Sequence, residues 1–425
     1  MSGLRIDTEW LPGQLDLPEE AASLAALKVE LGGRLLSRLY QRQSGTERER
    51  VHIPTYPLAS GLVHGWWPLL YEPVRGRATS PAIATRHRLD AMLPGYLFPP
   101  LEIWSAGADL VSVAAVAPEH EAAQIARSEF LMYPLPAEQV LARSDIVAAL
   151  SDLIAATLDR VTRRQADADA LATAWSRLRA AMADPEEAAF CRAAGRLGLD
   201  PFDPDTPDLA VLSDGMSDVL FAELCEAVEI DDLAAAVATT RAASQRLRTR
   251  KTKGIDIGRL GDFPHTSSFG PAWERGYHGA HELRRRLGIS VDSLRDTDDL
   301  LGGSLRLPLD SPPALEGVLR RDGNEIRASL AWHSVPQHRF RLGRALYLGW
   351  RAGADGETAI TMARTREQQA SRAFAAELLA PKVVLVERAG RYGLAMDEID
   401  DLAKAFGCPA QVVRDQAWNH HIPVV

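Results

Sequence analysis

The spacing of the apolar residues changes near Pro136, and this change constrains the fold more than any other feature of the chain. Before it, short apolar runs are interrupted by glycine and proline, as in "LEIWSAGADLVSVAAV" (residues 101–116), which predicts a β-hairpin. After it, apolar residues recur every three to four positions, as in "SDIVAALSDLIAATLDRVTRR" (144–164), which is the period of an amphipathic helix. We therefore expect an α+β, predominantly helical fold.

A chain of 425 residues is too long for one compact core. The patterns predict three parts. Residues 1–135 form a mixed α/β domain of unknown role with the hairpin, and residues 136–254 form a helical region. The basic stretch "RLRTRKTKG" (246–254) then serves as a linker to a third domain over residues 255–425.

Composition excludes several classes of protein. No apolar run approaches the ~18 residues that a membrane span needs, so no membrane association is expected. The cysteines Cys191, Cys225 and Cys408 lie far apart and form no CxxC motif, which argues against disulfides and favours the reducing cytoplasm. A net charge of −9 disfavours a broad nucleic-acid surface.

The last third has a definite order of elements. The stretch "PAWERGYHGAHELRRRLGI" (271–289) predicts a helix that stops at Gly288 and whose apolar face carries Trp273, Tyr277, Ala280, Leu283 and Leu287. The stretch "EIRASLAW" (325–332) predicts a strand. Helices follow in "RFRLGRALYLGW" (339–350) and "REQQASRAFAAELLA" (366–380). Two short helices then form the tail, and the break at 407–409 lies between them. Acidic residues outnumber basic ones in this tail, so we expect it to pack on the domain core rather than bind DNA.

These segments resemble the ImmA/IrrE family of bacterial zinc metallopeptidase-like proteins. In that family a segment of the form RFxLAHELGH precedes a helix containing FAAELLxP and a small helical tail. Here "RFRLGRALYLGW", "FAAELLAP" and "LAKAFGCPAQVVRDQAWN" follow one another in the same order. The resemblance covers residues from about Gly254 to the C-terminus. It implies a metallopeptidase-like fold for that part.

The residues that bind zinc in this family are missing from the corresponding positions. An HExxH helix works because two histidines four residues apart share one face, while the glutamate activates water. Aligned on Arg339 and Phe340, the first histidine position is Arg344, the glutamate position is Ala345 and the second histidine position is Leu348. None of these side chains can bind a cation or accept a proton in that role.

The family's third zinc ligand falls at Ala370, and Glu367, one turn earlier, is the only acid nearby. These five positions, Arg344, Ala345, Leu348, Ala370 and Glu367, are therefore vestigial, and we expect no catalytic residue, metal or cofactor. Arg344 and Glu367 lie on two helices that face each other in the family fold. We therefore expect a salt bridge between them in place of the zinc.

Two alternatives involve other residues. His333 and His338, with Glu367, would form a rearranged zinc site, in which case the protein would be an active metallo-endopeptidase. The basic linker, including Lys251, would instead suit a DNA-associated regulator. Trp66 and Trp67 are a candidate binding patch. Because adjacent residues diverge by about 100° on a helix, we expect one in the core and the other half-exposed.

The hypothesis that combines these observations is a cytoplasmic, catalytically inactive ImmA/IrrE-like pseudopeptidase. It would bind a protein or peptide and act in stress response, repressor regulation or defence against phage and mobile elements. That biological setting is what the family resemblance implies. The sequence predicts neither the identity of the partner nor the oligomeric state.

Overall fold

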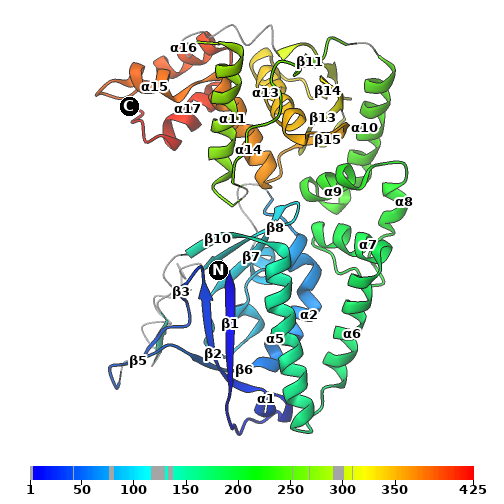
Figure 1. The fold of residues 1–425 in the computed structure, drawn as a ribbon, viewed down its shortest axis with the longest axis vertical. Coiled ribbons are helices and arrows are strands. Elements are labelled where there is room, and N and C mark those ends of the chain that lie inside the picture. Colours follow the sequence, from blue (N-terminus) through cyan, green and yellow to red (C-terminus); the bar gives the residue numbers. More distant parts are fainter. Residues whose placement is uncertain are drawn as a thin grey trace. The chain divides into compact units, whose positions relative to one another are not determined.

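The computed structural model describes residues 3–41, 43–75, 81–115, 130–132, 137–250, 252–267, 269–290, 301–308 and 310–425. The fold is α+β and predominantly helical, as expected (Figure 1). The chain divides into two compact units, Met1–Leu209 and Ala210–Val425. Within the described residues, no helix has both the length and the apolar character of a membrane span.

The described residues of the N-terminal unit form three small antiparallel sheets and a set of helices around one apolar core. Its strands are β1 (Leu4–Trp10), β2 (Leu24–Leu31), β3 (Arg34–Leu35), β4 (Leu39–Gln41), β5 (Thr46–Arg48), β6 (Val51–Pro54), β7 (Leu101–Gly107), β8 (Leu110–Ala115), β9 (Phe130–Met132) and β10 (Ala137–Ala142). Its helices are α1 (Pro18–Ala22), α2 (Thr55–Tyr71), α3 (Pro81–Arg86), the 3₁₀ turn η1 (Asp90–Met92), α5 (Arg143–Arg163), α6 (Asp169–Ala183) and α7 (Pro185–Arg196).

In the first sheet, β2 pairs with β1 along one edge and with β6 and β3 along the other. The predicted hairpin is confirmed, because β7 and β8 pair antiparallel around a two-residue turn at Ala108 and Asp109, closed by the pair Gly107–Leu110. Positive φ angles at Gly107 (87°) and at the first turn residue, Ala108 (43°), let the chain reverse in so short a turn. The central helix α2 follows β6 directly at Pro54 and buries Leu58, Leu62 and Trp66 at helical spacing.

In the C-terminal unit, the strands that the structure describes form one mixed sheet with helices packed against it. Helix α8 (Leu209–Ser213) spans the division between the units. The strands are β11 (Ile255–Asp256), β12 (Leu305–Arg306), β13 (Leu315–Asp322), β14 (Glu325–Leu330) and β15 (Gly356–Thr361). The helices are α9 (Asp218–Ala227), α10 (Ile230–Thr249), α11 (Ala272–Leu287), α13 (Val335–Ala352), α14 (Arg366–Leu379), α15 (Lys382–Ala389), α16 (Met396–Phe406) and α17 (Ala410–Asn419).

The sheet of this unit has the order β11-β14-β13-β15, and β12 adds to β14 in parallel. Helix α13 packs against β14, β13 and β15, while α14 lies between α13 and α11 (Figure 1). The predicted strand in residues 325–332 and the break between the tail helices at 407–409 are both confirmed. Arg339 of α13 donates to the carbonyl oxygens of Phe406 and Gly407, at 2.7 and 2.9 Å, and so holds the end of α16.

The helical region expected over residues 136–254 does not form a body of its own. The apolar stripes of α5, α6 and α7 are buried in the N-terminal core. Helices α9 and α10 belong to the C-terminal unit, where Glu223 accepts a hydrogen bond from the Ala359 N–H at 2.7 Å. The boundary between units therefore lies at Leu209 and Ala210, instead of the expected positions after residues 135 and 254.

Candidate functional site

The position of the site is set by α13, the helix that corresponds to the metallopeptidase helix in the resemblance. The Ser334 side chain caps its start by accepting from the Gln337 N–H, and Pro336 occupies its first turn. Gly353, with φ 70°, ends the helix in the left-handed conformation. Every residue from 341 to 350 is buried, so this helix is the centre of the C-terminal core.

The Arg344 side chain is completely buried, with 0 % exposure, and it is surrounded by hydrogen-bond acceptors. Its Nη1 pairs with a carboxylate oxygen of Glu316 on β13. Its Nε donates to Ser371 Oγ at 3.0 Å, and its Nη2 donates to Thr361 O at 2.7 Å and Gln368 Oε1 at 2.6 Å. A guanidinium has five N–H donors and remains charged, so four acceptors on three elements satisfy most of its bonding.

Glu316 is the carboxylate of this cluster and serves two arginines. Its other oxygen accepts from Arg341 Nε at 3.2 Å, and Arg341 also donates to Ala331 O at 2.7 Å. Burial by itself raises the pKa of Glu316, but Arg344 and Arg341 outweigh burial and hold this pKa below its usual range. The carboxylate is therefore ionised at neutral pH and compensates the buried positive charge.

The expected salt bridge between Arg344 and Glu367 is not formed. Glu367 pairs instead with Arg275 of α11, with 2.9 Å between Nη1 and Oε1, and it accepts from the Tyr347 hydroxyl at 3.3 Å. The reason is the rotation of α14. Gln368 and Ser371, three residues apart, both face Arg344, whereas Glu367 is rotated by about 100° from Gln368 and faces Arg275 of α11. Arg344 still links α13 to α14, but through these neutral side chains.

The remaining vestigial positions are apolar and lie inside the core. Ala345 and Ala370 are completely buried, and Leu348 has 5 % of its surface exposed. No atom of these three side chains can bind a cation. The residues that the resemblance aligns with the zinc ligands and the general base are a guanidinium and three hydrocarbon side chains, and these do not fit a zinc ion.

The rearranged zinc site is also not assembled. His338 Nε2 lies 2.7 Å from Ser304 Oγ, and His333 Nδ1 lies 3.0 Å from Arg341 Nη1. Glu367 pairs with Arg275, so each of the three candidate ligands has a separate partner. Burial, together with the nearby arginines, lowers the pKa of His338. Within the described part of the chain, no group of three or more His, Cys, Asp or Glu residues has the arrangement of a metal site.

The tryptophan pair on α2 is not a surface patch. Trp66 and Trp67 have 1 % and 3 % of their surfaces exposed, so the expectation of one half-exposed ring was wrong. Trp66 packs edge-on against Trp175 of α6, and Trp67 lies against Tyr71. The α2 helix is covered on both sides by α5, α6, α7 and β7, which buries neighbouring residues whose side chains diverge.

The basic linker is partly helix. Helix α10 extends to Thr249, and Arg248 forms a salt bridge with Glu357 of β15 at 3.0 Å. Arg327 of β14 donates to Leu247 O at 2.9 Å, so this end of α10 is docked on the sheet. Lys251 lies outside the described residues.

Exposed apolar side chains lie beside the arginine cluster, where three strand ends meet. Strand β14 ends just before Trp332, β15 ends just before Met362, and β13 starts between them. Trp332 is 38 % exposed and Met362 58 %, and Val335 at the start of α13 is 61 % exposed. Arg306 stacks over the Trp332 ring at 4.3 Å. This edge of the sheet, hereafter the strand-end surface, is apolar and carries positive charge.

Sequence reasoning missed the acceptors around Arg344, namely Glu316, Thr361, Gln368 and Ser371. The signal for Glu316 was a lone acid in the apolar run "ALEGVL". Comparison with family models, with curated proteins and with solved structures gives no match to this chain.

Proposed function

We propose that the C-terminal unit contains a degenerate ImmA/IrrE-like domain that acts by binding a protein or peptide and not by hydrolysis. The observation that supports this proposal is the buried Arg344, which the resemblance aligns with the family's first zinc-binding histidine. Its guanidinium is held by Glu316, Ser371, Gln368 and Thr361. A buried cluster that links two strands to two helices stabilises a scaffold and supplies no nucleophile, general base or Lewis acid.

The proposed setting is the bacterial cytoplasm, in stress response, repressor regulation or defence against phage and mobile elements. In this proposal the partner protein or peptide binds at the strand-end surface. Exposed apolar side chains beside cationic groups favour a partner segment that carries both apolar and acidic residues.

The alternatives of a zinc peptidase and of a DNA-binding linker are less favoured, because His333, His338, Glu367 and Arg248 each have a partner within the unit.

Substitution on this surface is expected to remove a specific partner. Met362→Ala shortens an exposed side chain that extends beyond the end of β15, and Trp332→Ala removes the ring beside Arg306. Affinity capture from the native host, followed by mass spectrometry, should recover a protein with the original chain that is depleted at least about tenfold with either variant.

The matched control is Trp418→Ala, because Trp418 is 82 % exposed at the end of α17, outside the strand-end surface. This variant should retain the partner. The proposal fails if the captured proteins are the same for all variants, or if the purified chain hydrolyses a captured protein.

A further inference from the structure

Among the described strands, β1 pairs only with β2, which leaves its other edge free. The Leu11 N–H donates to Leu24 O at 2.9 Å, and the Gly32 N–H donates to Gly3 O at 3.2 Å. In an antiparallel pair, every second residue of a strand forms its backbone hydrogen bonds with the partner strand. Because residues 3 and 11 bond to β2, the other odd-numbered residues of β1 do so as well. The residues that direct their backbone N–H and C=O groups away from β2 are Leu4, Ile6, Thr8 and Trp10.

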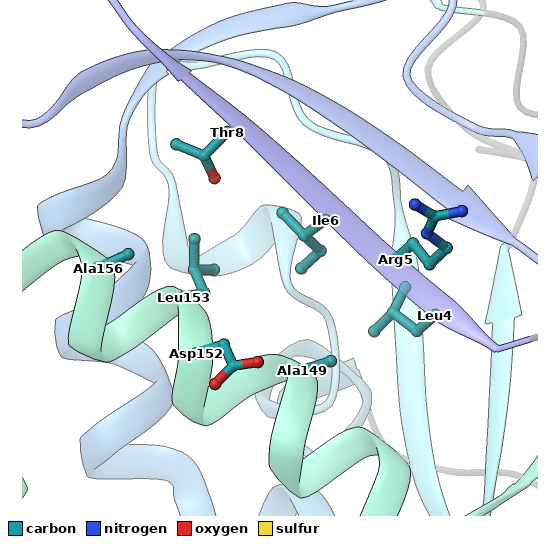
Figure 2. Close-up of a pocket in the computed structure, with 8 residues that line it drawn as sticks. All are labelled: Leu4, Arg5, Ile6, Thr8, Ala149, Asp152, Leu153 and Ala156. Atoms are coloured by element: carbon teal, nitrogen blue, oxygen red, sulfur yellow. The ribbon is translucent and has the colours of Figure 1, made fainter.

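A groove lies beside this edge. The Leu4, Ile6 and Thr8 side chains point toward helix α5, and a cavity of about 370 Å³ separates them from it (Figure 2). The helix contributes mostly short or apolar side chains to the lining, namely Ala149, Asp152, Leu153 and Ala156. Ile6 and Thr8 are only half-buried, so apolar surface remains open next to the unpaired backbone groups.

The face of β1 that points away from α5 carries one basic residue followed by two acidic residues. Arg5, Asp7 and Glu9 are all exposed, and Arg50 of the same chain pairs with Asp7 at 2.6 Å and with Glu9 at 3.7 Å. Pairing two copies of β1 antiparallel through their free edges aligns even residues with even and odd with odd. When the pairing is centred on Ile6, Arg5 lies opposite the second copy's Asp7, and when it is centred on Asp7, Arg5 lies opposite the second copy's Glu9. Each register brings two pairs of opposite charges together, which stabilises cross-strand pairing. The register centred on Asp7 also places Asp7 opposite the second copy's Asp7, and this repulsion favours the register centred on Ile6.

We propose that β1 pairs with β1 of a second copy of this chain, antiparallel about a two-fold axis. The two four-stranded sheets then form one continuous sheet, and both free edges are covered. The Ile6 and Thr8 side chains of the second copy lie on the α5 side, where they fill the groove. A second copy is favoured over an unrelated peptide, because Arg5 of each β1 then lies opposite an acidic residue of the other β1.

Sedimentation velocity of the full-length chain at micromolar concentrations tests this proposal. The original chain should be a dimer. Arg5→Glu removes the opposite-charge pairs, and Thr8→Pro removes an outward N–H that β2 does not use. Each should raise the dimer dissociation constant by at least about tenfold. Arg179→Glu makes the same change of charge on α6 and should leave the dimer unchanged.

Two variants with opposite charges on β1 separate loss of pairing from misfolding, because their association when mixed requires both to be folded. A chain with Arg5→Glu has only acids on this face of β1, and a chain with Asp7→Lys and Glu9→Lys has only bases. Neither should dimerise alone, whereas an equimolar mixture should form a heterodimer. The proposal is overturned if the original chain is a monomer, if its dimer persists in both Arg5→Glu and Thr8→Pro, or if the two exchanged chains fail to associate.

Discussion

Replacing Glu316 by glutamine is expected to destabilise the C-terminal unit by about 3–5 kcal/mol. Glutamine keeps the shape of the side chain but removes the negative charge that compensates Arg344 and Arg341. Arg344 is completely buried and cannot lose its proton, so the variant retains an uncompensated buried charge. Hydrogen exchange of the α13 amides in the full-length chain measures this loss, because it reports opening of this unit separately from the N-terminal unit.

Two further variants show whether the loss comes from the buried charge. Asp401→Asn breaks an exposed pair with Lys404 at 3.0 Å and should leave hydrogen exchange in α13 unchanged. Adding Arg344→Met to Glu316→Gln replaces the buried charge with an apolar side chain of similar length and should recover part of the stability. Equal exchange rates in the original chain and in Glu316→Gln would contradict the role of this cluster.

The effect of Glu316→Gln should also depend on pH. A carboxyl whose pKa is lowered in the folded state stabilises the protein above its unfolded pKa, and this contribution is lost as pH falls through the folded pKa. The difference in stability between the original chain and the variant should therefore be full near neutral pH and should shrink below about pH 4. A difference that stays constant through the acid range would show that the glutamine acts through packing alone.

Gly276→Ala is expected to destabilise the same unit by about 3 kcal/mol, the upper part of the usual range for overpacking. Gly276 lies where α11 crosses α14. An added Cβ would lie 2.4 Å from Ala370 O and 2.7 Å from Phe374 N, which are backbone atoms that cannot move aside individually. The two helices would have to separate, which would also shift Gln368 and Ser371 away from Arg344. Denaturant unfolding of the full-length chain measures the change.

The matched control for this substitution is Gly65→Ala in α2. Its new Cβ would meet only the Met92 Cε, at an ordinary contact distance of 3.7 Å. Alanine is favoured over glycine in helices by up to about 1 kcal/mol, so this variant should be neutral or slightly more stable. An equally small effect of both substitutions would contradict the close packing of α11 on α14 at Gly276.

Much of the fold was predictable because local rules set it. Gly107 and Asp109 mark the hairpin turn, and Pro54 marks the end of β6. The expected apolar face of α11 was only partly correct. Trp273 is 51 % exposed, while Gly276 and Gly279 are buried against α14 and Phe263. A hydrophobic pattern cannot identify a face that packs through glycines, because close approach of two backbones leaves no apolar side chain to count.

The candidate site was predictable in position but not in its contacts. The resemblance indicated Arg344 as the replaced zinc ligand, and the structure places it at the centre of the C-terminal core. Its carboxylate partner could not be found from the helices, because Glu316 belongs to β13, a strand interrupted by Gly317 and by charged residues near its end. Whether Gln368 or Glu367 bonds Arg344 depends on how α14 is rotated about its axis. The sequence does not show this rotation, because it is set by the packing of α14 against both α11 and α13.

We propose that an arginine–carboxylate cluster lies where the resemblance places the zinc centre of a metallopeptidase. The most direct test is the metal content of the purified full-length chain after exposure to zinc and removal of loosely bound ions. We predict far less than one zinc per chain, with no change in His333→Ala or His338→Ala. One zinc per chain that is lost in either histidine variant would contradict the claim.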